Sequence, residues 1–356
     1  MARTKISSAQ FFVAMFVSHI LVTIALNAQY TGGESILDNI VSYLIAMAAG
    51  VLIALPIWLC QKRGGVPELA AKALGAAGGI VPVAYWLYFV LAGSSSLALF
   101  QIFLMDTVNP GFSAGLVTAA IVGVALYGAL HGIETVARCA SCVFVVMLLG
   151  CGLVFGIVAV RFDTGNLEPM FRDGFSQTRQ GTALFLARTS LFADMAVLLP
   201  QVKGNRAKGF AGWIIGTTAF VSLTLLLIAG CLGRYAYTQN FPVYVLASLT
   251  EVRSLQRLDA IFTGVWMMGL TIKLAVDMYA CRVCFFSMTG NRERKWPLWG
   301  TAILLLALAL LTVGNSFLQR WLLDPWVLCW CTVISGGALP LLVWLAALVR
   351  GKGAAE

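Results

Sequence analysis

Two charged residues stand four positions apart in the middle of a long apolar stretch. Lys273 and Asp277 share one face of the helix expected over residues 259–286. A charge at the centre of a bilayer costs at least ~2.5–3.5 kcal/mol, so each residue needs a partner or contact with water. The two residues are therefore either an ion pair that permits its own burial, or fixed charges that organise a polar cavity.

A third charge, Asp194, follows the polar residues Thr189 and Ser190 within another apolar stretch. This pattern suits a helix that is interrupted in mid-membrane, where unwound backbone is tolerated only when it lines protein or a cavity. In the alternative, both hydroxyls bond to carbonyls of the preceding turn and the helix stays whole. No Gly or Pro of the kind that often marks a break is present between residues 183 and 199, so both alternatives remain open.

Further polar residues lie in two other apolar stretches. His19 follows Ser18, and an interior histidine held by hydrogen bonds is the simplest explanation. A proton carrier or a ligand contact is the alternative. Ser94, Ser95 and Ser96 supply small polar groups, which favour close helix packing more than binding.

The elements that carry these residues are expected to be membrane-spanning helices. Of the 356 residues, 60% are hydrophobic and 11% are charged, against roughly 25% charged residues in soluble chains. Apolar runs of about 20 residues, each able to cross ~30 Å of hydrocarbon, recur along the sequence. They predict an all-α membrane protein, a single polytopic domain over residues 1–356. The ten predicted transmembrane helices cover residues 9–28, 40–59, 81–105, 114–130, 140–160, 183–199, 210–232, 259–286, 298–313 and 325–349.

The loops between these helices alternate in charge. One set, which includes both chain ends, holds fifteen Lys and Arg residues, and the other set holds seven. The positive-inside rule places the richer set and both termini in the cytoplasm, and topology thus explains the net charge of +9 without nucleic acid. Five helices over about 9–160 and five over about 183–349 give halves of opposite orientation, as an inverted-repeat transporter fold requires. Residues 241–246, too few to span, are expected to form an amphipathic segment on the outer surface.

No motif in the sequence indicates catalysis or a bound cofactor. There is no Gly-rich phosphate loop, HExxH sequence or nucleophile elbow, so we expect the protein not to be an enzyme. Cys139 with Cys142 and Cys281 with Cys284 have the spacing of zinc ligands, but cysteines used as small apolar residues are the favoured explanation. None of the nine cysteines falls in an outer loop, and no extracellular disulfide framework is expected.

Several short stretches follow one another in a specific order along nearly the whole sequence. They are residues 5–10 (KISSAQ), residues 166–174 (NLEPMFRDG), Phe192-Ala193-Asp194 with Pro200, residues 241–244 (FPVY), and residues 255–262 (LQRLDAIF) with Trp266 and Lys273. In order and spacing they resemble the spore-germination permease family, the B subunits of nutrient germinant receptors. The resemblance implies the amino acid–polyamine–organocation architecture, in which broken helices 1 and 6 meet at a central site lined also by helices 3 and 8.

The resemblance further implies a small nutrient germinant, commonly an amino acid, and two protein partners. These are an A-type subunit and a lipoprotein C-type subunit in the spore inner membrane. The implied ligand site has as candidates Ser18, His19, Ile20, Thr23, Ser94, Thr189, Ser190, Phe192 and Asp194. The charge pair implied for its cavity is Lys273 with Asp277. A stand-alone proton-coupled amino-acid permease is the alternative function.

Two positions depart from the pattern of the families that the sequence resembles. Ser18 and His19 stand where the superfamily commonly has a pair of glycines. Asp194 stands where the germination family more often has glutamate. These differences bear on the identity of the ligand more than on the fold.

Overall fold

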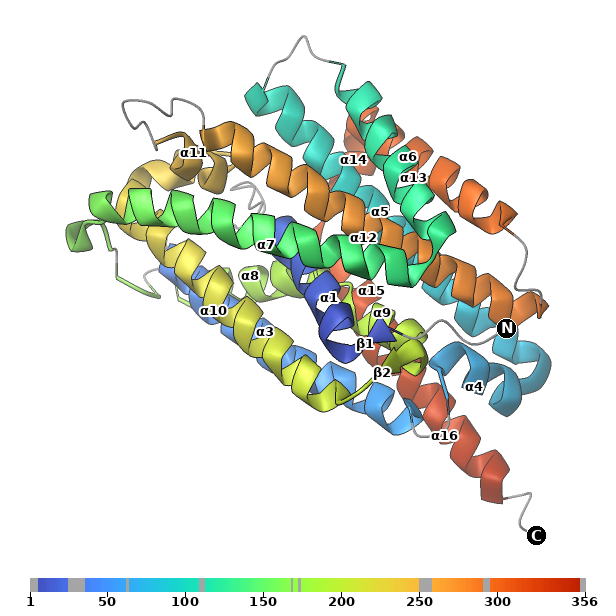
Figure 1. Cartoon of the computed structure of the whole chain (residues 1–356). Helices are drawn as coiled ribbons and strands as arrows, with labels where there is room; N and C mark the ends of the chain where they lie inside the picture. The colour runs from blue at the N-terminus through green and yellow to red at the C-terminus, as the bar shows by residue number, and fades with distance from the viewer. Residues whose placement is uncertain are drawn as a thin grey trace.

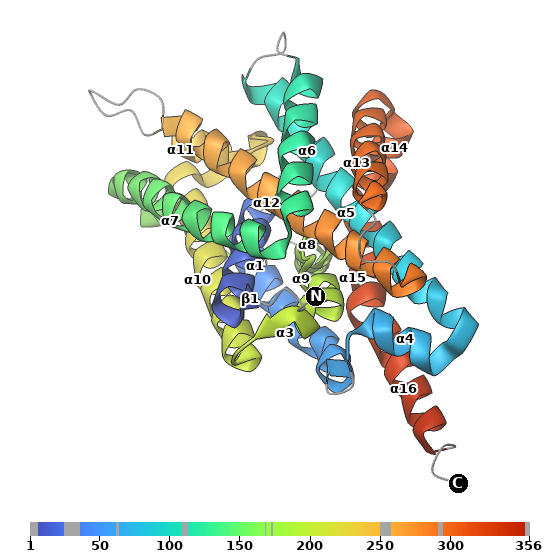
Figure 2. The ribbon, with the colours of Figure 1, turned by 45° about the vertical axis from the view of Figure 1, so that its right-hand side comes forward.

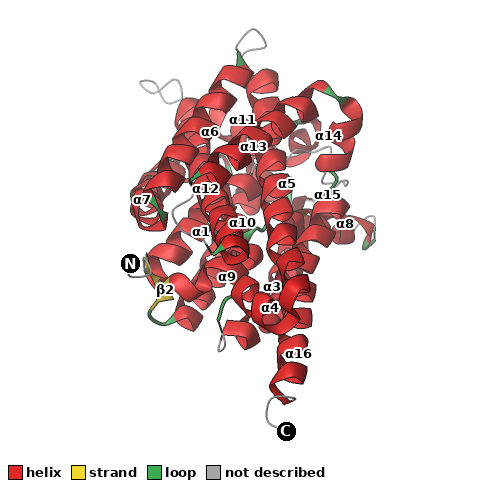
Figure 3. Ribbon diagram, turned by 90° about the vertical axis from the view of Figure 1, so that its right-hand side faces the viewer, coloured by secondary structure: helices red, strands yellow, loops and turns green. Residues whose placement is uncertain are grey.

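The chain, described here from a computed structural model, consists almost entirely of helices (Figure 3). The structure describes residues 6–24, 36–61, 64–108, 113–167, 169–171, 174–249, 258–290 and 295–352. Within these ranges, nine helices are long and apolar enough to cross a membrane, and a shorter apolar helix precedes them. Together they account for the ten predicted spans.

The uninterrupted helices lie close to their predicted positions. They are α1 (Ser8–Thr23), α3 (Ile36–Gln61), α5 (Ile80–Phe103), α6 (Ala114–His131), α7 (Ile133–Val158), α10 (Arg206–Leu232), α12 (Leu258–Thr289) and α13 (Trp296–Gly314). The largest difference is at α7, which begins seven residues before the predicted start. Gly132, with a φ of 97°, makes the whole turn after α6, and the ion pair of Glu134 with Arg138 continues α7 beyond its apolar segment.

Two predicted spans are not continuous α-helices. The sixth consists of α8 (Ser176–Ala187) and α9 (Leu191–Leu198), separated by Arg188–Ser190. The tenth consists of α15 (Pro325–Val333), a π-helical turn η7 (Ile334–Ala338) and α16 (Leu339–Lys352). The predicted interruption of helix 6 is therefore confirmed.

Helix 1 is represented by α1, whose 16 residues extend about 24 Å, less than the ~30 Å of a bilayer core. The predicted continuation to residue 28 lies outside the described residues, and the break expected in helix 1 stays a prediction. Position 5, residues 168, 172 and 173, and residues 255–257 of the family-like stretches also lie outside the described part.

Three short helices join the long ones: α4 (Val66–Leu74), α11 (Pro242–Ser248) and α14 (Ser316–Leu322). α11 contains most of the segment predicted to be amphipathic. Its apolar residues Val243 and Leu246 are buried, and α11 packs against α10 and α12. The segment therefore buries its apolar face against the protein's own helices.

Burial separates central from peripheral helices. In the most apolar part of each span, 83% of residues are buried for the span containing α5 and for that formed by α8 and α9, against 22% for α7. Figures 1 and 2 show α8 and α9 inside the bundle, and both pack against α3. The polar residues whose burial costs free energy thus belong to helices that the rest of the bundle shields from lipid.

The start of the chain is tied to the end of helix 6. β1 (Ile6–Ser7) pairs in parallel with β2 (Val202–Lys203), and the Ser8 hydroxyl donates to the Asn205 carbonyl at 3.0 Å. β1 and the end of α16 lie toward the same end of the bundle, with α11 at the other end (Figure 1). The contacts of β1 and Ser8 join the start of α1 to the segment that follows α9.

Candidate functional site

The interruption of helix 6 spans Arg188–Ser190 and leaves the start of α9 without a side-chain cap. The Thr189 hydroxyl donates to the Phe185 carbonyl at 2.8 Å, the back-bonding that the alternative hypothesis required. The helix is interrupted nevertheless. The first α9 amide that bonds back along the chain is that of Asp194, which donates to the Ser190 carbonyl. The preceding amide groups form the positive end of the α9 dipole, which favours an anion.

Arg188 joins this interruption to the end of α1. Its guanidinium donates to the carbonyl oxygens of Val22 at 3.3 Å and Thr23 at 3.4 Å, and His19 forms a hydrogen bond with its backbone. The last carbonyl groups of a helix have no partner within the helix, and a cation there also suits the negative end of the dipole. Arg188 therefore holds the end of α1 against the interruption.

His19 is directed toward α3 and α10. Its Nε2 atom lies 2.8 Å from the Tyr43 hydroxyl, its Nδ1 atom lies 3.3 Å from the Thr23 hydroxyl, and its ring packs against Trp213. The side chain is only 4% exposed. These partners satisfy the imidazole within the helix bundle, as the simplest interpretation of the sequence expected.

Two aromatic residues fix the other side of the interruption. The Tyr88 hydroxyl on α5 lies 3.3 Å from the Thr189 carbonyl, to which it donates, and 3.1 Å from the Thr332 hydroxyl. Phe192 on α9 is packed between α3 and η7. A Cβ atom at Gly50 would come within 2.4 Å of its ring, and one at Gly336 within 2.6 Å of its Cβ. Only glycine permits the helices to approach Phe192 this closely.

A cluster of three buried charged residues lies beside the interruption. The Lys273 ammonium donates to Asp277 Oδ2 at 2.6 Å, and neither side chain is more than 3% exposed. Asp194, also buried, interacts electrostatically with both. The Oδ1 atoms of Asp194 and Asp277 have no hydrogen-bond partner. Gly93 on α5 allows close packing against α13, since a Cβ there would come within 2.6 Å of Leu305 Cδ2.

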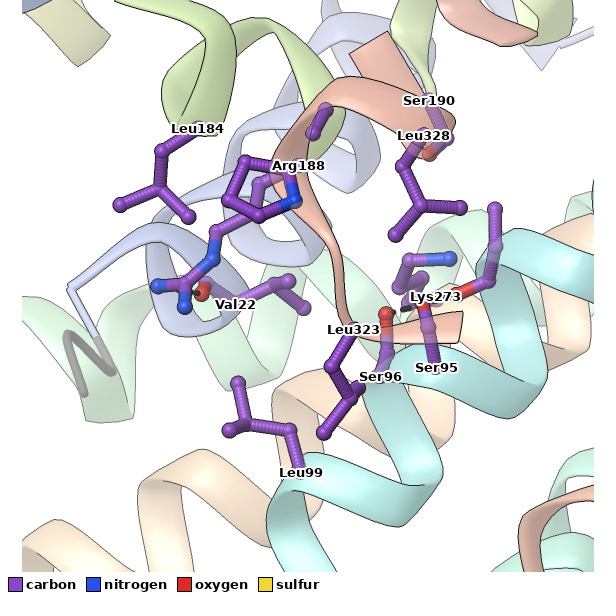
Figure 4. Close-up of a pocket in the computed structure, with 13 residues that line it drawn as sticks. Val22, Ser95, Ser96, Leu99, Leu184, Arg188, Ser190, Lys273, Leu323 and Leu328 are labelled. Atoms are coloured by element: carbon purple, nitrogen blue, oxygen red, sulfur yellow. Dashed lines mark hydrogen bonds between the residues drawn. The ribbon is translucent and has the colours of Figure 1, made fainter. Parts of the chain in front are cut away.

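A cavity of about 40 Å³ lies between the interruption, α5 and α12. Its polar lining consists of Arg188, Ser190, Lys273, Ser95 and Ser96. Arg188 and Lys273 lie on opposite sides, with Ser95 and Ser96 beside Lys273 (Figure 4). The apolar lining is Val22, Ala92, Leu99, Leu184, Ala187, Leu323, Pro325 and Leu328. The space admits water but is far below the ~300 Å³ of a typical ligand pocket, so a larger ligand fits only if the lining residues move.

Of the residues predicted for the site, Ser190 and Lys273 line this cavity, and Asp194 and Asp277 form the cluster behind it. The other candidates do not line it: Ser18, His19, Ile20, Thr23, Ser94, Thr189 and Phe192. The Ser18 hydroxyl bonds to the Ala14 carbonyl at 2.8 Å, and the Ser94 hydroxyl reaches the Leu305 carbonyl on α13 at 3.2 Å. Ile20 is fully buried.

Three polar lining residues were not among the predicted ligand contacts: Arg188, Ser95 and Ser96. Arg188 gave the stronger signal, because a cation inside an apolar span requires a partner or a cavity. Ser95 and Ser96 could be recognised from the sequence only as small polar residues, and in the structure both hydroxyls bond to the Ala92 carbonyl of their own helix.

The two cysteine pairs lie on different helices, and the pair on α12 lies near the charge cluster. Cys139 and Cys142 are exposed on α7, whereas Cys281 and Cys284 are buried on α12, and all nine cysteines are free thiols. In the described ranges, no three His, Cys, Asp or Glu residues are grouped as metal ligands would be.

An all-α bundle with an interrupted central helix beside a buried polar cavity has the architecture of the transporter fold. Solved structures agree on the fold. A Na⁺-coupled sialic acid symporter superposes with a TM-score of 0.65, at 11% identity, over 95% of this chain and 90% of its own. A manganese transporter of Eremococcus coleocola superposes with a TM-score of 0.54, at 13% identity, over 96% of this chain and 76% of its own.

The chain belongs to the family of the spore germination protein permeases, whose model matches residues 5–317. Spore germination protein KB of Bacillus subtilis (strain 168) is 23% identical over 342 residues, which cover 90% of this chain and 89% of that protein. Putative spore germination protein YfkT of the same strain is 23% identical over 243 residues, 65% of this chain and 66% of its own. The predicted family and the all-α transporter fold are thus confirmed.

Proposed function

We propose that this protein is the membrane-embedded sensing subunit of a spore germination receptor, and that it binds a small nutrient, an amino acid, at the interruption of helix 6. The observation that carries the proposal is the cavity lined by Arg188, Ser190 and Lys273 beside the uncapped start of α9. This combination of fixed cations, a hydroxyl and backbone amides inside a membrane protein suits a carboxylate.

A zwitterionic amino acid needs acceptors for its ammonium as well as donors for its carboxylate. The carboxylate is assigned to the α9 amides with Ser190 and Lys273. The ammonium is assigned to Asp194, whose Oδ1 atom has no partner inside the protein. The apolar lining from Leu99 and Leu328 then surrounds the side chain of the ligand.

The small volume of the cavity fits a sensor that changes shape on binding. A nutrient enters only if the helices around the 40 Å³ space move apart, and closure over the ligand then alters the outer surfaces of the bundle. In this proposal, an A-type subunit and a lipoprotein C-type subunit in the spore inner membrane bind the altered surface and respond to it.

The proposed orientation places both termini in the cytoplasm, on the side of the β1–β2 pair. Single cysteines at Asn205, near that pair, and at Asn240, near Asp106 at the other end, test it in intact membranes. We expect a membrane-impermeant maleimide added from outside to label position 240 only. Labelling of both positions from that side contradicts the orientation.

Filling the cavity tests the proposed function. Ser96→Leu inserts a large side chain into the lining without changing a charge, and Ser96 loses only a bond to its own helix. Spores with this variant are expected to lose their nutrient response. The matched control is Ser141→Leu, since the Ser141 hydroxyl likewise bonds only to its own helix, α7, away from the cavity. An unchanged response of well-expressed Ser96→Leu protein refutes the proposed site.

A stand-alone proton-coupled permease is the second candidate, favoured by the superposition on a symporter. Purified protein in liposomes distinguishes the two. Accumulation of an amino acid driven by a pH gradient, without partner subunits, supports the permease, and binding without accumulation supports the receptor subunit.

A further inference from the structure

We propose that Asp194, Asp277 and Lys273 form a proton-binding site, in which the two carboxylates together hold one proton. All three side chains are at most 3% exposed, and they interact electrostatically with one another. Two carboxylates face one ammonium. With all three ionised, the cluster has an uncompensated negative charge in a poorly polarisable interior, and such a charge is expensive to bury.

The hydrogen bonds of the cluster also lack a donor. Lys273 donates to Asp277 Oδ2 and the Ser190 side chain bonds to the Asp194 carboxyl group, but Asp277 Oδ1 and Asp194 Oδ1 have no partner. An ionised carboxylate has only acceptor sites, whereas a protonated one carries a donor. One bound proton therefore supplies both the missing positive charge and the missing donor.

The neighbouring groups do not provide this charge. Tyr88 on α5 and Cys281 and Cys284 on α12 are the titratable groups that interact with the carboxylates from the helices packed against them. Their ordinary pKa values of about 8.5–10 leave them uncharged at neutral pH. Arg188, the other cation of the cavity, directs its guanidinium to the end of α1.

A metal cation suits the cluster less well than a proton. The Lys273 ammonium already occupies one of the four carboxylate oxygens and repels a second cation. Oxygen-binding cations such as Ca²⁺ take about six to eight oxygen ligands, which two aspartates alone do not provide. Because Lys273 also lines the cavity, it connects the buried carboxylates to the water that the cavity admits. The proton is expected to exchange by this route.

Infrared spectroscopy of the full-length protein tests this site without any ligand. Aspartate labelled with carbon-13 at the side-chain carboxyl gives separate bands for the protonated and ionised forms. At neutral pH we expect a protonated band equivalent to one aspartate per chain. Either single variant, Asp194→Asn or Asp277→Asn, removes it, because the remaining carboxylate is neutralised by Lys273. Lys273→Met is expected to double it, because both carboxylates then require a proton.

The control is Asp163→Asn, in the exposed loop after α7, which should leave the band unchanged. The absence of a protonated band in the wild-type protein overturns the proposal even if a variant does not fold. The proposal is also overturned if the band persists in both aspartate variants, or if it disappears when NaCl is added at constant pH. None of these results depends on nutrient binding, so the proton site and the proposed function can fail separately.

Discussion

The two sides of the helix 6 interruption bury ionisable residues in different ways. On the α1 side, His19 has hydrogen bonds to Tyr43 and to the backbone of Arg188, whose guanidinium holds the carbonyls at the end of α1. On the α12 side, Asp194 and Asp277 each keep a carboxyl oxygen without a partner. Burial alone therefore does not separate a structural residue from a binding residue. On the α1 side the polar groups have hydrogen-bond partners and hold the helices together. On the α12 side the carboxyl oxygens without partners are available to bind a proton or a ligand.

The largest effect is expected on the α12 side, from Lys273→Met. This change leaves two buried carboxylates without their cation, and breaking a buried pair costs about 3–5 kcal/mol of folding free energy. Thermal unfolding in detergent measures the loss. The defect should shrink at acidic pH, because the second proton that the folded variant must take up is then also bound to the unfolded chain.

The double variant Lys273→Met with Asp277→Asn is the control for this prediction. It removes both members of the pair and should recover stability relative to Lys273→Met alone. Independent, additive losses of stability from the two changes would show that Lys273 and Asp277 do not act as a pair. The α12 side would then not differ from the α1 side in the way described above.

A smaller loss of stability is expected on the α1 side, from His19→Phe. The ring contact with Trp213 is kept, but the Arg188 backbone and Tyr43 lose a partner, at about 1–3 kcal/mol. Nutrient affinity should stay within a factor of a few. A loss of affinity larger than the loss of stability would show that His19 contacts the ligand after all.

The smallest effect is expected from Tyr88→Phe, which removes a hydroxyl bonded to the Thr189 carbonyl and to the Thr332 hydroxyl at the edge of the interruption. Each neutral hydrogen bond contributes about 0.5–1.5 kcal/mol, and both of these are near the long end of the distance range, so the melting temperature should fall only slightly. A loss of stability as large as that of Lys273→Met would mean that the Tyr88 hydroxyl supports the charge cluster rather than the contact between helices.

The helices could be predicted from the sequence because apolar runs of span length leave few alternatives in a membrane. The same holds for the pairing of Lys273 with Asp277, since i and i+4 share a helix face and buried charges need partners. The interruption at Arg188–Ser190 was predicted only as one of two alternatives, because it contains neither Gly nor Pro.

The direction of each side chain could not be predicted. Phe192 and Ser190 lie two positions apart, yet Ser190 lines the cavity while Phe192 points between Gly50 and Gly336. His19 likewise turns toward Tyr43, 24 positions along the chain. Which face of a central helix meets the cavity depends on long-range packing, and in uniformly apolar helices the polarity pattern carries little information about it.

The central claim is that the α12 side of the interruption binds the nutrient, and Asp194→Asn tests it most directly. Asparagine keeps the shape of the side chain but removes the charge that is assigned to the ligand's ammonium. The measurement is equilibrium binding of the germinant, identified from a panel of amino acids by spore response, to purified Asp194→Asn and His19→Phe proteins. Affinity for Asp194→Asn should fall by about 1.5–3 kcal/mol, roughly 10- to 150-fold, with little change in stability without ligand. Unchanged binding to well-folded Asp194→Asn protein, or an equal loss in His19→Phe, contradicts the claim.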